Sequence, residues 1–427
     1  MTARPACIFG RNDLLSMVFD PKIDLNGFRR GIVSVYNIVT RYACPRLDGT
    51  AASPENVRPS AGLQQRRRLR RKSKNMAHAL TQSDVISALK GVKDPDLNRD
   101  LTDLGMIRDI VIGPDSVRLT VNLTTPACPL KEKIRGDVES ALLSRLPADI
   151  KTIDIQMTAE VRGKGVREKG DIPGVKNVIA VGSGKGGVGK STLATSIALG
   201  LKSYGSSVGL MDADIYGPSI PHLVGASGRP MAKGDRIQPI EAAGLKVMSM
   251  GFLLEPERAV IMRGPMLHGV ITQFLHQVDW GDLDYLVIDL PPGTGDVPLT
   301  LAQALPLTGA VVVCTPQAVA LLDAVRAITM FRQLKVPILG MVENMTGEVF
   351  GRGGAAKKAE EMDIPFLGEV PLLTAIREKG DAGNAGAVFD DQAASRMPLL
   401  NVVERLAAQI SIQNIKKPKM PTLEILG

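Results

Sequence analysis

The chain contains few of the residues on which several functional classes depend. Aromatic residues make up 4% of its 427 residues, so an aromatic platform for stacking nucleic-acid bases is not expected. Four cysteines are too few for a disulfide framework. The apolar run 31–39 is far too short to span a bilayer, and the N-terminus lacks the order of a signal peptide. We therefore expect a cytoplasmic protein with no membrane partner.

Positive charge is concentrated at the N-terminus. The formal net charge is +8, but residues 1–75 hold 15 Lys+Arg and 5 Asp+Glu, whereas the remainder holds 37 and 39. The run QRRRLRRK at 65–72 could belong to a nucleic-acid-binding arm or an organelle-targeting segment. We favour the simpler interpretation, a disordered basic extension over 1–75, and expect no nucleic-acid partner for the rest of the chain.

Residues 79–160 have the pattern of a small α/β domain. A capped helix through Leu89, alternating strands at 116–123 and 152–157, and a helix at 130–146 are predicted. The segment TPACPL places Cys128 just before the second helix, where the helix dipole lowers a thiol pKa. A semi-buried cysteine in a turn is the alternative. The Gly-, Lys- and Arg-rich segment 161–175 is typical of a linker.

Residues 176–412 alternate short apolar strands with helices, and 413–427 form a tail. Apolar strands that lack alternation are buried on both faces, which predicts a mostly parallel sheet covered by helices. The fold class is therefore α/β, with this larger domain preceded by the smaller one. The predicted strands are Val178–Val181, Val208–Met211, Leu245–Met250, Tyr285–Asp289, Ala310–Cys314, Ile338–Val342 and Phe366–Val370.

A glycine-rich loop joins the first of these strands to a helix, in the stretch NVIAVGSGKGGVGKST at 177–192. It satisfies G-x-x-x-x-G-K-[ST], whose backbone N–H groups cradle phosphates. In such a loop Lys190 reaches the β- and γ-phosphates of ATP and the Ser191 hydroxyl holds Mg²⁺. A dinucleotide-binding G-x-G-x-x-G also matches, but it gives Lys190 and Ser191 no role. The predicted nucleotide-binding residues are Gly184, Lys185, Gly186, Gly187, Val188, Gly189, Lys190, Ser191 and Thr192.

Acidic residues end two of the predicted strands. Asp289 lies where a carboxylate can hold Mg²⁺, and the turn 292–295 that follows it can sense a γ-phosphate. Asp212 and Asp214 follow another strand, and we expect one to orient the attacking water and the other to order Mg²⁺. A structural pair of loop acids is the alternative. Ligands bind at this carboxyl edge of parallel sheets.

Several motifs give the chain a resemblance to a known family. The loop KGGVGK resembles that of the MinD/Mrp/nitrogenase-reductase class, and RGPM, DWGDLDY, PPGTGD, TPQ and VENM resemble its Mrp branch. Residues 80–160 resemble the small MIP18-like domain that often precedes these ATPases. The resemblance implies a homodimer in which Lys185 reaches the partner's nucleotide, an adenine contact by Asn344, and transfer of iron–sulfur clusters to apoproteins. It also marks Cys128 as a reactive or metal-binding residue.

The chain departs from this family at one place. Many members carry C-x-x-C after the Asn-Met pair, whereas here Asn344-Met345 is followed by TGEVFGRGG, which contains no cysteine. Four thiolates normally hold such a cluster, so Cys128 becomes the remaining candidate ligand, and Cys314 is expected in the core. Two other functions stay open: a MinD/ParA-like positioning switch, and a regulatory scaffold that binds ATP without a cluster.

Overall fold

The structure is a computed structural model in which residues 80–163, 171–253 and 264–416 are described. The predictions for residues 1–75, for most of the linker and for residues 417–427 lie outside these ranges. No helix in the described ranges is both long and apolar enough to cross a membrane.

The smaller domain contains a three-stranded sheet, a two-stranded antiparallel sheet of β1 and β2, and two helices. The three-stranded sheet has the order β3-β4-β5, antiparallel between the first two strands and parallel between the last two. Thr81 caps the first helix by accepting a hydrogen bond from the Asp84 N–H, and the Asp84 carboxylate accepts one from the Thr81 N–H. The elements are α2 (Gln82–Leu89), β1 (Lys93–Asp94), β2 (Arg99–Asp100), β3 (Ile107–Ile112), β4 (Ser116–Leu123), α3 (Lys131–Arg145) and β5 (Thr152–Ala159).

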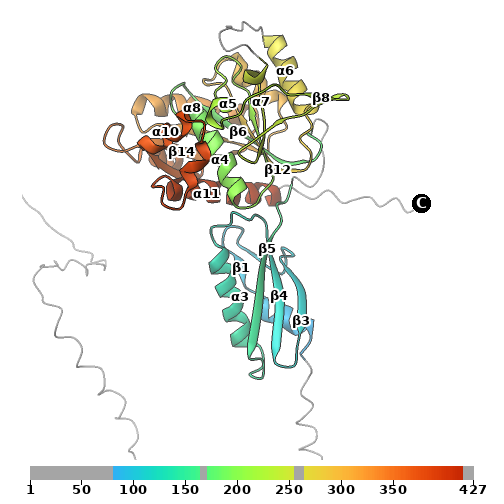
Figure 1. Ribbon diagram of the computed structural model, residues 1–427. Coiled ribbons are helices and arrows are strands. Elements are labelled where there is room, and N and C mark those ends of the chain that lie inside the picture. The colour runs from blue at the N-terminus through green and yellow to red at the C-terminus, as the bar shows by residue number, and fades with distance from the viewer. Residues whose placement is uncertain (1–79, 164–170, 254–263, 417–427) are drawn as a thin grey trace, which may run out of the picture. The chain divides into compact units, whose positions relative to one another are not determined.

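The larger domain contains an eight-stranded sheet with helices on both faces (Figure 1). The strand order is β10-β11-β7-β12-β6-β13-β14-β15, and only the edge strand β10 is antiparallel to its neighbour. The strands are β6 (Val175–Ser183), β7 (Val208–Asp212), β10 (Ile240–Ala242), β11 (Leu245–Ser249), β12 (Leu283–Asp289), β13 (Gly309–Cys314), β14 (Ile338–Thr346) and β15 (Phe366–Pro371). All seven predicted strands are present in this sheet. The predicted fold class is confirmed.

The helices of this domain follow the strands in alternation. They are α4 (Lys190–Ser203), α5 (Ile220–Leu223), α6 (Gly264–His276), α7 (Asp296–Ala304), α8 (Ala318–Gln333), α9 (Gly354–Glu361), α10 (Thr374–Asp381) and α11 (Arg396–Lys416). Two short 3₁₀ helices (Met250–Phe252 and Ala385–Phe389) and a hairpin of β8 (Ala232–Lys233) and β9 (Arg236–Ile237) complete it. Helix α11 continues four residues beyond the predicted end of the domain at 412.

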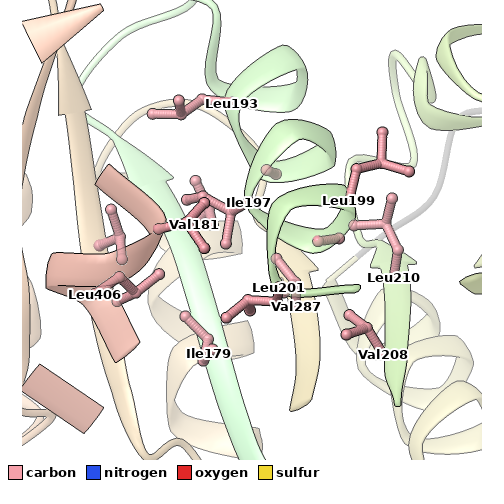
Figure 2. Close-up of a cluster of buried hydrophobic side chains, with 14 of the residues drawn as sticks. Ile179, Val181, Leu193, Ile197, Leu199, Leu201, Val208, Leu210, Val287 and Leu406 are labelled. Carbon is pink, nitrogen blue, oxygen red and sulfur yellow. The ribbon is translucent and has the colours of Figure 1, made fainter. Parts of the chain in front are cut away.

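Each face of the central sheet has its own apolar core, because successive side chains of a strand point to opposite faces. On one face Ile179 and Val181 of β6 pack with residues of α4 and α11, as Figure 2 shows. On the other face Val178 and Ala180 of the same strand join a cluster that includes residues of α6 and α8. The central strands are therefore buried on both sides, as their continuous apolar sequences predict.

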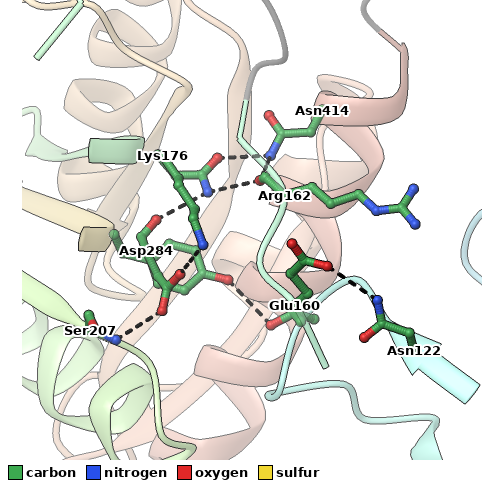
Figure 3. Close-up of polar contacts among 10 residues, drawn as sticks. Asn122, Glu160, Arg162, Lys176, Ser207, Asp284 and Asn414 are labelled. Atoms are coloured by element: carbon green, nitrogen blue, oxygen red, sulfur yellow. Dashed lines mark hydrogen bonds and ion pairs between the residues drawn. The ribbon is translucent and has the colours of Figure 1, made fainter. Parts of the chain in front are cut away.

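A polar network holds the beginning of β6 (Figure 3). Asn177 is fully buried; its amide donates to the carbonyls of Arg162 and Asp284, and its side-chain oxygen accepts a bond from Asn414. Lys176 pairs with the Asp284 carboxylate at 2.9 Å. Because the other end of β6 leads into the glycine-rich loop, this network fixes the strand that carries the loop.

Candidate functional site

The glycine-rich loop occupies the carboxyl end of β6, where it lines a cavity of about 220 Å³. Gly187 and Gly189 have φ angles of 78° and 79°, a left-handed conformation that a Cβ atom disfavours. Gly189 is also the residue before α4, so the loop passes directly into a helix N-terminus. The cavity is lined by Ser183, Lys185, Gly186, Gly187, Gly189, Lys190, Ser191, Thr192, Asp214 and Pro292. Backbone N–H groups and a helix dipole thus meet at one concave surface, which suits an anion.

Lys190 and Asp289 form a buried ion pair beneath this cavity. Lys190 Nζ lies 2.5 Å from Asp289 Oδ1 and 3.2 Å from Ser191 Oγ. Burial raises the pKa of the Asp289 carboxyl, and the charge of Lys190 opposes that rise. The second oxygen, Asp289 Oδ2, is buried and has no hydrogen-bond partner among the residues that the structure describes. An unpaired carboxylate oxygen beside a serine hydroxyl is a donor set that fits Mg²⁺, which prefers oxygen ligands.

The two acids of the segment Asp212-Ala213-Asp214 (the DAD segment) have different positions. Asp214 is half-buried and lines the phosphate cavity, whereas Asp212 is 1% exposed and does not line it. Asp212 Oδ2 accepts bonds from Ser249 Oγ and the Ile220 N–H, and its Oδ1 accepts one from the Asp214 N–H. Burial, together with the charge of Asp289, raises the pKa of Asp212 to about 7. The structure therefore separates an acid that faces the cavity from one that holds the loop behind it.

Three further contacts hold the glycine-rich loop in place, and the loop motif does not predict them. Ser183 Oγ donates to the Lys185 carbonyl at 2.9 Å. The Gly293 N–H, in the turn after β12, donates to the Ser183 carbonyl, so this amide is already satisfied within the protein. A Cβ atom on Gly184 would lie 2.1 Å from the backbone of Asp323 in α8. Only the first contact joins residues that are close in sequence, because Ser183 lies two residues before Lys185, whose carbonyl it binds.

A second cavity of about 200 Å³ lies beside the first and shares Gly189 and Thr192 with it. Asn344, at the end of β14, lines this second cavity together with apolar residues. Its neighbour Glu343 is fully buried and accepts bonds from the N–H groups of Gly353 and Ala355 at the start of α9. The second cavity is lined by Gly189, Thr192, Leu193, Ser196, Leu223, Asn344, Met345, Val370, Pro371, Leu372, Leu373, Ile376, Arg377, Gly380, Asp381 and Leu399.

Cys128 does not have the lowered pKa that its position before α3 predicts. The Leu130 N–H does bond to its sulfur, but burial outweighs this bond, and the acids Asp94, Asp96 and Glu404 add to the effect. Together they raise the pKa of the thiol to about 11, so this part of the prediction is wrong. The semi-buried alternative agrees with its intermediate exposure.

The surroundings of the two cysteines in the described part of the chain differ from the donor sets that metals require. Cys314 is buried at the end of β13, as expected for a core residue. Within the described residues, no group of three or more His, Cys, Asp or Glu side chains is arranged to hold a metal ion.

Comparisons with known proteins place both domains. The model of the NUBPL iron-transfer P-loop NTPases matches residues 174–409, and that of an iron–sulfur cluster assembly protein matches residues 82–155. The chain is 45% identical over 350 residues to an iron–sulfur cluster carrier protein of Synechocystis sp., covering 78% of this chain and 99% of that relative. It is 47% identical over 345 residues to a carrier protein of the same description from Deinococcus radiodurans, covering 78% of this chain and 97% of the relative.

Solved structures are also similar to part of the chain. A nucleotide-binding protein of Archaeoglobus fulgidus in complex with ADP is 41% identical, with a TM-score of 0.45, over 50% of this chain and 88% of that one. The first family model spans more than half of the chain, and the two carrier proteins match along nearly their whole length. The chain therefore belongs to the NUBPL iron-transfer P-loop NTPases.

Proposed function

We propose that this protein is an Mg-dependent ATPase that carries iron–sulfur clusters and transfers them to apoproteins. The observation that supports it most is the phosphate loop with the Lys190–Asp289 pair beneath it, in a chain whose carrier relatives match across both domains. ATP binding and cluster transfer are distinct parts of this proposal. ATP binding is supported by the residues of the phosphate cavity. Cluster transfer is supported by the similarity to the carrier relatives.

Residues in and beside the phosphate cavity take different roles in ATP hydrolysis. The loop N–H groups from 184 to 190 bind the phosphate oxygens, and Lys190 exchanges Asp289 for the β- and γ-phosphates. Ser191 and Asp289 would hold Mg²⁺, which would neutralise charge on the phosphates. Asp214, at the cavity wall, orients the attacking water, and Asp212 positions the Asp214 backbone through its hydrogen bond to that N–H.

The second cavity binds the adenine base. It shares a wall with the phosphate cavity, is mainly apolar, and has the Asn344 amide at its edge. Apolar side chains cover the faces of a base, and a side-chain amide can pair with its polar edge.

Lys185 acts in trans in a homodimer. Its side chain is half-exposed at the phosphate cavity. Two apolar residues at the start of α8, Val319 and Leu322, are 67% and 64% exposed, and the same helix contacts the loop through Asp323 and Gly184. A partner subunit covering this surface would bring its own Lys185 to the nucleotide, where a cation stabilises transition-state charge. Closure by ATP and opening after hydrolysis would couple nucleotide state to cargo binding.

The cluster is cargo, and its ligands in this chain differ from a C-x-x-C pair. The segment after Asn344 closes into a short loop by a bridge between Gly347 and Gly351 and contains no cysteine. Among the described residues, Cys128 is the cysteine that is only partly buried, whereas Cys314 is buried. Two subunits would then supply two thiolates, with the remaining ligands coming from elsewhere.

The test is the iron and sulfide content of the full chain after anaerobic reconstitution, compared between wild type and Cys128→Ser. Stoichiometric cluster in the wild type and none in the variant supports a carrier whose ligand is Cys128. Cluster in both rejects Cys128 as the ligand. Its absence from both rejects carriage and favours the second function, an ATP-dependent scaffold.

A third function, a MinD/ParA-like positioning switch, differs in its partner. It requires ATP-dependent binding to a membrane or to DNA. Pelleting with anionic vesicles, with and without ATP, separates it from the carrier, because the carrier is expected to stay in the supernatant in both conditions.

A further inference from the structure

We propose that Asn344 is a positioning residue for the phosphate loop, in addition to any contact with the base. This inference rests on the proposed ATP site. The Asn344 side chain joins the two cavities, since it lines the base cavity and its amide nitrogen lies 2.9 Å from the carbonyl oxygen of Val188 in the loop. Asn344 thus holds the shape of the anion site whether or not a base is present.

The chemistry of this contact fixes the orientation of the amide. A carbonyl oxygen can only accept a hydrogen bond, so the atom of Asn344 that faces Val188 is the donor, Nδ2. Val188 is 2% exposed, and Asn344 is 9% exposed, so water does not readily replace this bond. A buried carbonyl left without a partner costs free energy. The bond is therefore part of what determines the loop conformation.

The direction of one peptide group transmits this constraint to the phosphates. In a planar trans peptide the C=O and the following N–H point in opposite directions. Holding the Val188 carbonyl toward Asn344 therefore turns the N–H of Gly189 away from Asn344. Gly189 lines the phosphate cavity as well as the base cavity. The hydrogen bond that satisfies the Val188 carbonyl thus also orients the Gly189 N–H, a donor that an anion can use.

Close packing at Gly189 adds a second constraint. A Cβ atom placed there would lie 2.3 Å from Asn344 Nδ2 and 3.2 Å from the terminal methyl of Met345. The backbone beside Asn344 is also held, because the side chain of the adjacent Glu343 accepts hydrogen bonds from the N–H groups of Gly353 and Ala355 at the start of α9. The end of β14 therefore packs closely against the loop at Gly189 and leaves no room for a Cβ atom there.

The test uses a ligand without a base. Tripolyphosphate with Mg²⁺ and ATP with Mg²⁺ are titrated by calorimetry against the full-length wild type, Asn344→Ala and Asn344→Leu. These uncharged substitutions remove the donor without introducing repulsion. We expect both variants to bind tripolyphosphate about tenfold more weakly, the loss of one buried hydrogen bond. If Asn344 served the base alone, tripolyphosphate would bind all three proteins equally, and that result overturns the inference.

Leu372→Ala is the matched control, because Leu372 lines the base cavity and does not line the phosphate cavity. It should weaken ATP and leave tripolyphosphate unchanged. An equal loss of tripolyphosphate affinity in this control would overturn the inference, since any change in the base cavity would then have the same effect. A wild type that binds neither ligand would overturn both the inference and the proposed ATP site.

Hydrogen exchange gives a second measurement that does not depend on ligand affinity. Without nucleotide, the amides of residues 184–190 should exchange faster in Asn344→Leu than in wild type, and Leu372→Ala should match wild type. Unchanged exchange in the loop of Asn344→Leu would overturn the inference, even if the variant were less stable overall.

Discussion

Lys190 Nζ and Asp289 Oδ1 lie 2.5 Å apart, and the two side chains are 6% and 0% exposed. This pair joins the first residue of α4 to the last residue of β12. A buried carboxylate retains its charge only with such a partner, so Lys190 has a structural effect as well as its proposed role on the phosphates.

Replacing Lys190 by alanine should remove nucleotide binding and turnover, and it should also destabilise the domain. The removal of one partner of a buried ion pair costs about 3–5 kcal/mol, because the other charge stays buried. ATP titration and urea unfolding measure the two effects separately. The double variant Lys190→Ala, Asp289→Asn should recover much of the stability and none of the ATP binding. Full ATPase activity in Lys190→Ala would refute the phosphate-site assignment.

Replacing Lys185 by alanine should leave ATP binding near that of the wild type but slow hydrolysis, on the order of 10³-fold. The physical reason is the loss of the cation that reaches the partner's nucleotide. Single-turnover rates, together with the mass in solution with ATP, check both the chemistry and the dimer. A variant that turns over ATP at the wild-type rate would remove the in-trans role.

Asp212 should make stability depend on pH. Its pKa is raised from 3.8 to about 7 in the folded chain, so the folded state binds the proton more tightly than the unfolded state. Stability from this group is therefore present below about pH 4 and is lost as the pH rises toward 7. Thermal melts in EDTA without nucleotide should show a smaller decline over this window for Asp212→Asn than for wild type. If the melting temperatures of Asp212→Asn and wild type declined equally over this window, the raised pKa of Asp212 would be contradicted.

Cys128 should react slowly with alkylating agents at neutral pH. Its pKa is raised to about 11, and the thiolate is the reactive form, so the rate should increase about tenfold per pH unit from 7 to 10. Mass spectrometry of the modified peptide follows this rate at each pH. A rate that levels off near pH 8 would show an ordinary exposed thiol instead.

Gly184→Ala should destabilise the fold, whereas Gly186→Ala should not. A Cβ atom at Gly184 would meet the Asp323 backbone at 2.1 Å, while at Gly186 the nearest atom is 4.0 Å away. Forcing α8 away from the loop should cost on the order of 1–3 kcal/mol. Denaturant unfolding of the two variants provides the comparison. Equal free energies of unfolding for the two variants would show that α8 can move away from the loop without a cost in stability.

The strands and the phosphate loop could be predicted because their determinants are local. Val178–Val181 is a continuous apolar run, and the spacing of Gly184, Gly189 and Lys190 is sufficient to define the loop. The roles of the two DAD acids could not be separated in this way. Only the folded chain shows that Asp214 reaches the cavity while Ser249 and the Ile220 N–H enclose Asp212.

The remaining features depend on residues that are distant in sequence. The pKa of Cys128 is raised in part by Asp94 and Glu404, which lie far along the chain on either side of it. The base cavity combines residues of α4, α10 and α11 around Asn344, and no short motif contains them. Helix α11 runs to Lys416, past the domain end expected at 412, and its Asn414 bonds to Asn177, a contact that no local pattern predicts.

The network at the start of β6 has a mechanical consequence. Asn177 joins Arg162, Asp284 and Asn414 at one end of a strand whose other end is the phosphate loop, and the strand is hydrogen-bonded on both sides by β12 and β13. A strand that is hydrogen-bonded along both sides resists bending and stretching. The strand therefore keeps the phosphate loop and the Asn177 network at a fixed separation.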